Sequence, residues 1–136
     1  MPDSVDRDRL TSALVQAADG YLAWVRELLA AGADPNGMPL IMAIQCDEPE
    51  IVAAMVEAGA DPNRPYRDTT PLVHAIRGRH PDVVRVLIEA GADVTQAAPS
   101  GDTPWSALQA SGRTVPTPHE DAAIRAMLVA AQARRP

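Results

Sequence analysis

Apolar residues along this chain come in short runs with helical spacing, and polar turns separate the runs. In residues 51–56 and 83–88 the apolar side chains cover one broad face of a helix. Each run follows a proline beside an acidic residue, as in His80-Pro81-Asp82, and stops at a glycine, as at Gly91. Proline at the first helical position loses no hydrogen bond, because the N–H there has no partner within the helix. An acidic side chain interacts favourably with the positive end of the helix dipole, and glycine adopts the left-handed conformation that ends a helix. The pattern predicts short helices with well-marked ends.

A shorter helix is predicted before each of these runs. Thr70-Pro71 places a hydroxyl at an N-cap and a proline at the first helical position, and the apolar run 72–76 follows and ends near Gly78. Thr103-Pro104 repeats this opening. The chain therefore consists of helix–turn–helix pairs.

The pairs recur at a fixed interval. Gly-Ala-Asp occurs at 32–34, 59–61 and 91–93, and the first two copies continue as Pro-Asn. Pro39, Pro71 and Pro104 are 32 and 33 residues apart. Two independent marks at the same offset indicate an internal repeat.

This pattern resembles the ankyrin repeat, whose signature is Thr-Pro-Leu-His-x-Ala with a Gly-Ala-Asp-x-Asn loop. The resemblance covers nearly the whole chain as one domain of four units, at approximately 4–36, 37–65, 66–98 and 99–136. It implies an all-α ankyrin-repeat solenoid of stacked helix–turn–helix units with short β-hairpin-like finger loops. The last unit has a proline-rich insertion and no Gly-Ala-Asp, which is typical of a terminal cap.

The chain departs from the family pattern in three respects. No unit has His after the Thr-Pro-Leu opening, and Val73 holds that position in unit three. The usual glycine of the interhelix turn is Asp47 in unit two and Arg79 in unit three. Gly32 lies only seven residues before Pro39, whereas the corresponding distances later in the chain are 12 and 13 residues. We expect the finger between units one and two to be missing.

The composition of the chain limits the kinds of partner and the compartment that we expect. The formal net charge is −6 and the pI is about 4.9, so the overall field disfavours nucleic acid as a partner. The single cysteine, Cys46, excludes an intramolecular disulfide. The N-terminus has no apolar signal region and no apolar run approaches a membrane span. We expect a cytoplasmic monomer, with Trp24 and Trp105 packed into the core or its caps.

No residue pattern indicates catalysis, a metal or a cofactor. Cys46 with His74 or His80 as a base would need an orienting third group and an oxyanion hole, and none is evident. Cys46 instead aligns with Gly78 of the next unit. The histidines, His119 included, lack the clustered spacing of metal ligands, and those beside prolines fit helix entry.

The resemblance implies that finger loops and first helices line a concave side that holds a protein partner. Carried over position by position, the contact positions fall on two fingers and on the ends of first helices. They are Arg64, Tyr66, Arg67, Asp68 and Thr69; Pro99, Ser100 and Asp102; and Gln45, Cys46, Arg77, Gly78, Ala110 and Ser111.

The expected function is a non-enzymatic protein-interaction module or scaffold, with Tyr66 as its anchor between two arginines. Arg64, Arg67, Arg77 and Arg79 form either a solvated face or a basic spot that steers a partner with an acidic patch. An inhibitor or immunity-type protein that neutralises an enzyme is the narrower alternative. An enzyme subunit and self-association through the altered last unit are further alternatives.

Overall fold

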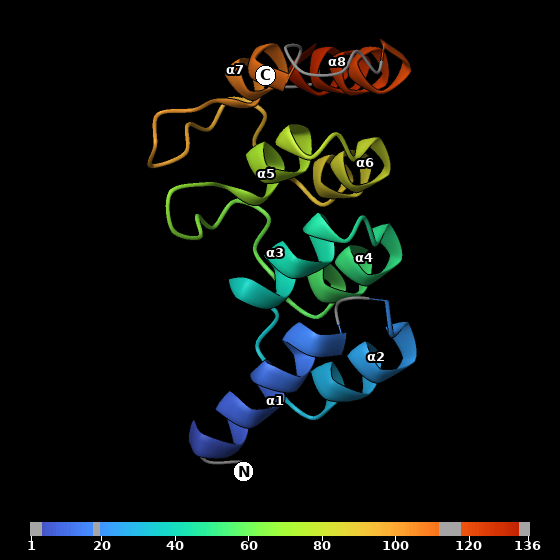
Figure 1. Cartoon of the computed structure of the whole chain (residues 1–136), viewed down its shortest axis with the longest axis vertical. Coiled ribbons are helices and arrows are strands. Elements are labelled where there is room, and N and C mark those ends of the chain that lie inside the picture. The colour runs from blue at the N-terminus through green and yellow to red at the C-terminus, as the bar shows by residue number, and fades with distance from the viewer. Residues whose placement is uncertain (1–3, 18–19, 112–117, 134–136) are drawn as a thin grey trace.

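A computed structural model describes residues 4–17, 20–111 and 118–133 of the chain. This part contains eight α-helices and no strands, arranged as four antiparallel pairs that stack in a row (Figure 1). The pairs are α1 (Ser4–Ala17) with α2 (Leu22–Ala30), α3 (Met38–Gln45) with α4 (Pro49–Glu57), α5 (Pro71–Arg77) with α6 (Pro81–Glu89), and α7 (Pro104–Ser111) with α8 (Pro118–Ala133). The predicted all-α repeat solenoid is confirmed.

The stack has two layers of helices. The first helices of the pairs, α1, α3, α5 and α7, form an inner layer, and α2, α4, α6 and α8 form an outer layer (Figure 1). The loops before α5 and α7 project past the inner layer, whereas the loop before α3 does not. The missing first finger is therefore confirmed, and we call the side of the inner helices and fingers the inner face.

The helix ends follow the chemistry of the sequence. The Thr70 hydroxyl accepts a hydrogen bond from the backbone N–H of Val73 at 3.3 Å, as an N-cap does. Asp47 and Arg79 take positive φ angles of 54° and 59° at the interhelix turns. Non-glycine residues thus accept the left-handed conformation at this position, with the modest strain that it carries.

One continuous core runs from Leu14 in the first unit to Leu128 in the last. Ile44, Ile76 and Leu87 are fully buried within it. Burial of each such aliphatic side chain contributes about 1.5–3 kcal/mol. Because each unit shares its apolar faces with its neighbours, the array folds as a stack rather than as a closed globule.

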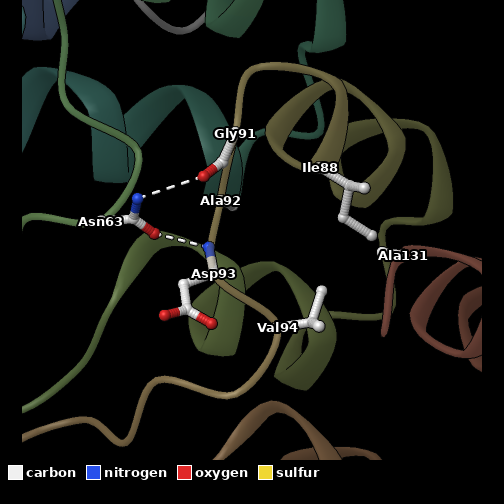
Figure 2. A pocket seen from close by; sticks show the side chains of 7 residues that line it. All are labelled: Asn63, Ile88, Gly91, Ala92, Asp93, Val94 and Ala131. Atoms are coloured by element: carbon white, nitrogen blue, oxygen red, sulfur yellow. Dashed lines mark hydrogen bonds between the residues drawn. The ribbon is translucent and has the colours of Figure 1, made fainter. Parts of the chain in front are cut away.

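The Gly-Ala-Asp-x-Asn loops join neighbouring units by hydrogen bonds. The Asn36 Oδ1 atom accepts from the Asp61 N–H at 2.8 Å, one unit further on. The Asn63 Oδ1 atom accepts from the Asp93 N–H at 2.6 Å, and its Nδ2 donates to the Gly91 carbonyl at 3.1 Å (Figure 2). Both steps share the bond from an aspartate N–H to the asparagine Oδ1 of the preceding loop, and together they form a ladder between the units.

The ladder changes at the third loop, where threonine replaces asparagine. The N–H and hydroxyl of Thr95 both donate to the Asp93 Oδ1 atom, at 2.9 and 2.7 Å, within the same loop. Unit four packs on unit three through α5 with α7 and α6 with α8.

One detail of unit one differs from expectation. The prediction that Trp24 is packed away is wrong, because 40% of its surface is exposed, beside the ring of Tyr21 at 6.3 Å between centroids. Trp105 does pack against the core. No helix in the described ranges is both long enough and apolar enough to span a bilayer.

Candidate functional site

A groove of about 400 Å³ lies on the inner face, between α3, the first projecting finger and α5. It brings together six of the predicted contact residues, and four others line it as well. We call it the inner groove. The predicted residues are Gln45, Tyr66, Arg67, Asp68, Thr69 and Arg77, and the others are Met38, Ile41, Met42 and His74.

The finger that walls the groove is a minimal hairpin. Tyr66 and Thr69 form an antiparallel bridge, with N–H to carbonyl distances of 2.9 and 3.2 Å. Arg67 takes the left-handed conformation at the turn, with φ of 58°. Its guanidinium lies over the Tyr66 ring, with Cζ 5.3 Å from the ring centroid. This cation–π contact positions an exposed cation at the rim.

Tyr66 also reaches the preceding unit. Its ring carbons lie 3.5 and 3.6 Å from the point where a Cβ atom on Gly37 would stand. Gly37 has φ of 84°, which glycine adopts without strain. The ring thus covers the short loop that carries no finger, and it packs on the core as a half-buried side chain. Tyr66 is both a wall of the groove and a contact between units two and three.

The floor of the groove is apolar and comes from α3. Met38, Ile41, Met42 and Gln45 are spaced i, i+3, i+4 and i+7, so they lie on one helical face. The first three were missed as site residues, although this spacing identifies a shared face. Cys46 caps the C-terminus of α3, and its Sγ lies 3.9 Å from the Met42 Sδ. Cys46 therefore borders the floor through Met42.

The second finger is tied to the first finger and to α5. Arg77 forms an ion pair with Asp102. The Ser100 hydroxyl donates to the same carboxylate at 3.1 Å, and the Ser100 N–H donates to the Asp68 carbonyl at 3.2 Å. These contacts place Ser100 and Asp102 beside the groove and fix the two fingers relative to each other.

The other predicted contact residues lie further from the groove. Arg64 and Pro99 are exposed on the two fingers, and neither lines the inner groove. Gly78 caps the far end of α5, beside the ring of His80. Ala110 and Ser111 belong to the last turn of α7, and their side chains fall outside the part that the structure describes.

The arginines of unit three differ in their surroundings. Arg79 is half-buried in the interhelix turn, and Arg77 is paired with Asp102. His74 lines the groove, and burial, followed by the charges of Arg77 and His80, lowers its pKa. Since His74 is therefore neutral near pH 7 and Arg77 is paired, Arg67 is the exposed cation of the groove lining that forms no ion pair with the described residues.

A second pocket, of about 420 Å³, lies between α6, the third Gly-Ala-Asp loop and α8 (Figure 2). The polar groups that Asn63 and Asp93 present there are already engaged in the loop hydrogen bonds. Within the described ranges, no three His, Cys, Asp or Glu side chains gather where they could hold a metal ion.

Comparison with known proteins agrees with the repeat geometry. The model of a family described as ankyrin repeats (3 copies) matches residues 6–98. This range covers the first three helix pairs except for the first two residues of α1, and it includes both asparagine-bearing loops of the ladder. A search of curated proteins found no match.

Proposed function

Since the chain belongs to the ankyrin-repeat family, we propose that it is a non-enzymatic module that binds a partner protein on its inner face. Ankyrin repeats are generally protein–protein interaction modules. The observation that carries the proposal is the inner groove, where the predicted contact residues Tyr66, Arg67 and Arg77 surround an apolar floor.

The composition and rigidity of the groove support this function. Tyrosine and arginine are enriched among residues that dominate binding energy, and an apolar centre excludes water from them. The finger bridge and the contact between Ser100 and Asp68 hold the walls before a partner arrives. A surface that is already ordered loses little conformational entropy on binding.

A site-specific crosslinking experiment tests the proposal. A photoreactive amino acid replaces Gln45, which is exposed in the groove, or Glu57, which is exposed on the outer layer of the same unit. In the source cells we expect a discrete protein adduct from position 45 and none from position 57. The proposal is wrong if position 57 crosslinks equally well, or if only position 57 does. An adduct with an enzyme that the full chain inhibits would identify the narrower function of an inhibitor.

A further inference from the structure

We propose that the inner groove binds a linear segment of the partner in which one apolar side chain lies next to one Asp or Glu. This inference rests on the proposed function, because it names the ligand of the same face. The apolar side chain would occupy the floor on α3, and the carboxylate would pair with Arg67 at the rim.

The floor selects the apolar part of the segment. Met38, Ile41 and Met42 form a patch bounded by the finger on one side and α5 on the other. A volume of about 400 Å³ is in the range of sites that enclose a single small ligand. Methionine side chains adapt their rotamers to the shape of what they contact. The patch therefore suits one protruding Leu, Met or aromatic side chain better than a flat protein surface.

The rim selects the acidic part. Arg67 is exposed and held over the Tyr66 ring, and no carboxylate within the described ranges forms an ion pair with it. A guanidinium binds a carboxylate through two parallel hydrogen bonds, and a fixed guanidinium loses less freedom in doing so. Asp68 lines the same groove, so its charge disfavours a second acid in the segment.

The net charge of −6 does not oppose this preference at short range. At physiological ionic strength the field of an exposed charge falls away over about 8 Å. Arg67 is adjacent to the floor, whereas Arg77 is occupied by Asp102. Arg67 therefore offers an incoming carboxylate a cation at contact distance, and the neighbouring Asp68 limits the preference to a single acid.

The test uses the full chain and a displayed library of short random peptides. We expect the selected peptides to share an apolar residue within two positions of an Asp or Glu. For a selected peptide, Arg67→Gln should weaken binding about tenfold, which is the effect of losing one charged hydrogen bond. The same peptide with its acid changed to the amide should bind the wild type about tenfold more weakly, and should bind the Arg67→Gln variant without further loss.

Two variants serve as controls for this measurement. Arg85→Gln removes an exposed arginine from the outer layer of the same unit and should leave the affinity unchanged. Met42→Gln places a polar side chain of similar length in the floor and should weaken every selected peptide, while its circular dichroism spectrum shows that it is folded.

The failures of this inference and of the proposed function are distinguishable. Selected peptides without an acid, or equal losses from Arg67→Gln and Arg85→Gln, overturn the linear acidic segment. So does a library that yields no binder. The wild-type chain could also dimerise in sedimentation experiments while Met42→Gln stays monomeric. A second copy of the chain would then occupy the groove, and this result would also overturn the proposal of a linear acidic segment. In each case an adduct from position 45 still supports binding of a protein on the inner face.

Discussion

Replacement of Asn63 by alanine tests how much the loop ladder contributes to the joint between units two and three. The side chain makes two hydrogen bonds across this joint, from the Asp93 N–H at 2.6 Å and to the Gly91 carbonyl at 3.1 Å (Figure 2). A typical intramolecular hydrogen bond contributes about 1 kcal/mol net. We therefore expect Asn63→Ala to lower the free energy of unfolding by about 2 kcal/mol.

Asn36→Ala is the matched comparison, because Asn36 also makes two side-chain hydrogen bonds, of which only one crosses a joint. Its Oδ1 accepts from the Asp61 N–H at 2.8 Å, and its Nδ2 donates to the Asp34 Oδ1 within its own loop at 3.1 Å. We expect this variant to cost about 2 kcal/mol as well, about half of it from the joint. Urea unfolding followed by circular dichroism gives both values. In thermal unfolding both variants should melt about 6 °C below the wild type, so the position of the effect distinguishes them.

Amide hydrogen exchange locates the effect. The Asp93 N–H should lose protection in Asn63→Ala and keep it in Asn36→Ala, and the Asp61 N–H should show the reverse. Thr95→Ala removes a hydroxyl bond that stays within its own loop, so it should cost less than either variant. Equal losses from Asn63→Ala and Thr95→Ala, with the Asp93 N–H still protected, would refute the ladder as a joint between units.

Three further predictions concern single side chains. Burial lowers the pKa of His74 in the folded chain, so as the pH falls below 6.5 the imidazole is protonated in the unfolded chain before it is protonated in the folded chain. The free energy of unfolding therefore decreases with falling pH, from about 6.5 down to the pKa of His74 in the folded chain. His74→Gln should therefore reduce the fall in melting temperature between about pH 7.5 and about pH 5, and an unchanged fall contradicts this. Thr70→Ala removes the cap on the Val73 N–H and should cost about 1 kcal/mol in urea unfolding, whereas Thr70→Ser should not. Gly78→Ala would place a Cβ atom 2.6 Å from the His80 Nε2 and should cost at least about 1 kcal/mol, with a smaller loss in a His80→Ala background, where the clash is absent.

The helix boundaries were predictable because local chemistry determines them. The Thr70 cap, the prolines that open α4 and α6, and the loop glycines act within a few residues of their own position. The positions of the finger residues followed from the repeat in the same way. Tyr66, Arg67 and Thr69 were therefore predicted correctly as members of one surface loop.

Other features depend on neighbouring units and were not predictable from local pattern. Trp24 occupies the position in unit one that Ile51 occupies in unit two, and the Ile51 side chain is only 1% exposed. Among the described residues no helix pair stacks on that side of unit one, so Trp24 stays exposed. Met38 and Met42 look like core residues in the sequence, and only the length of the loops and the position of the finger leave them at a groove.

The link between the two fingers has a consequence for redesign of this scaffold. The ion pair of Arg77 with Asp102 joins α5 to the second finger, and the hydrogen bond from the Ser100 N–H to the Asp68 carbonyl joins the two fingers. A combinatorial library that replaces Asp102 would lose the ion pair, and one that changes the length of either loop would lose the backbone bond. Paired randomisation of both loops, with these four positions kept, would retain a common geometry on which new specificities can be selected.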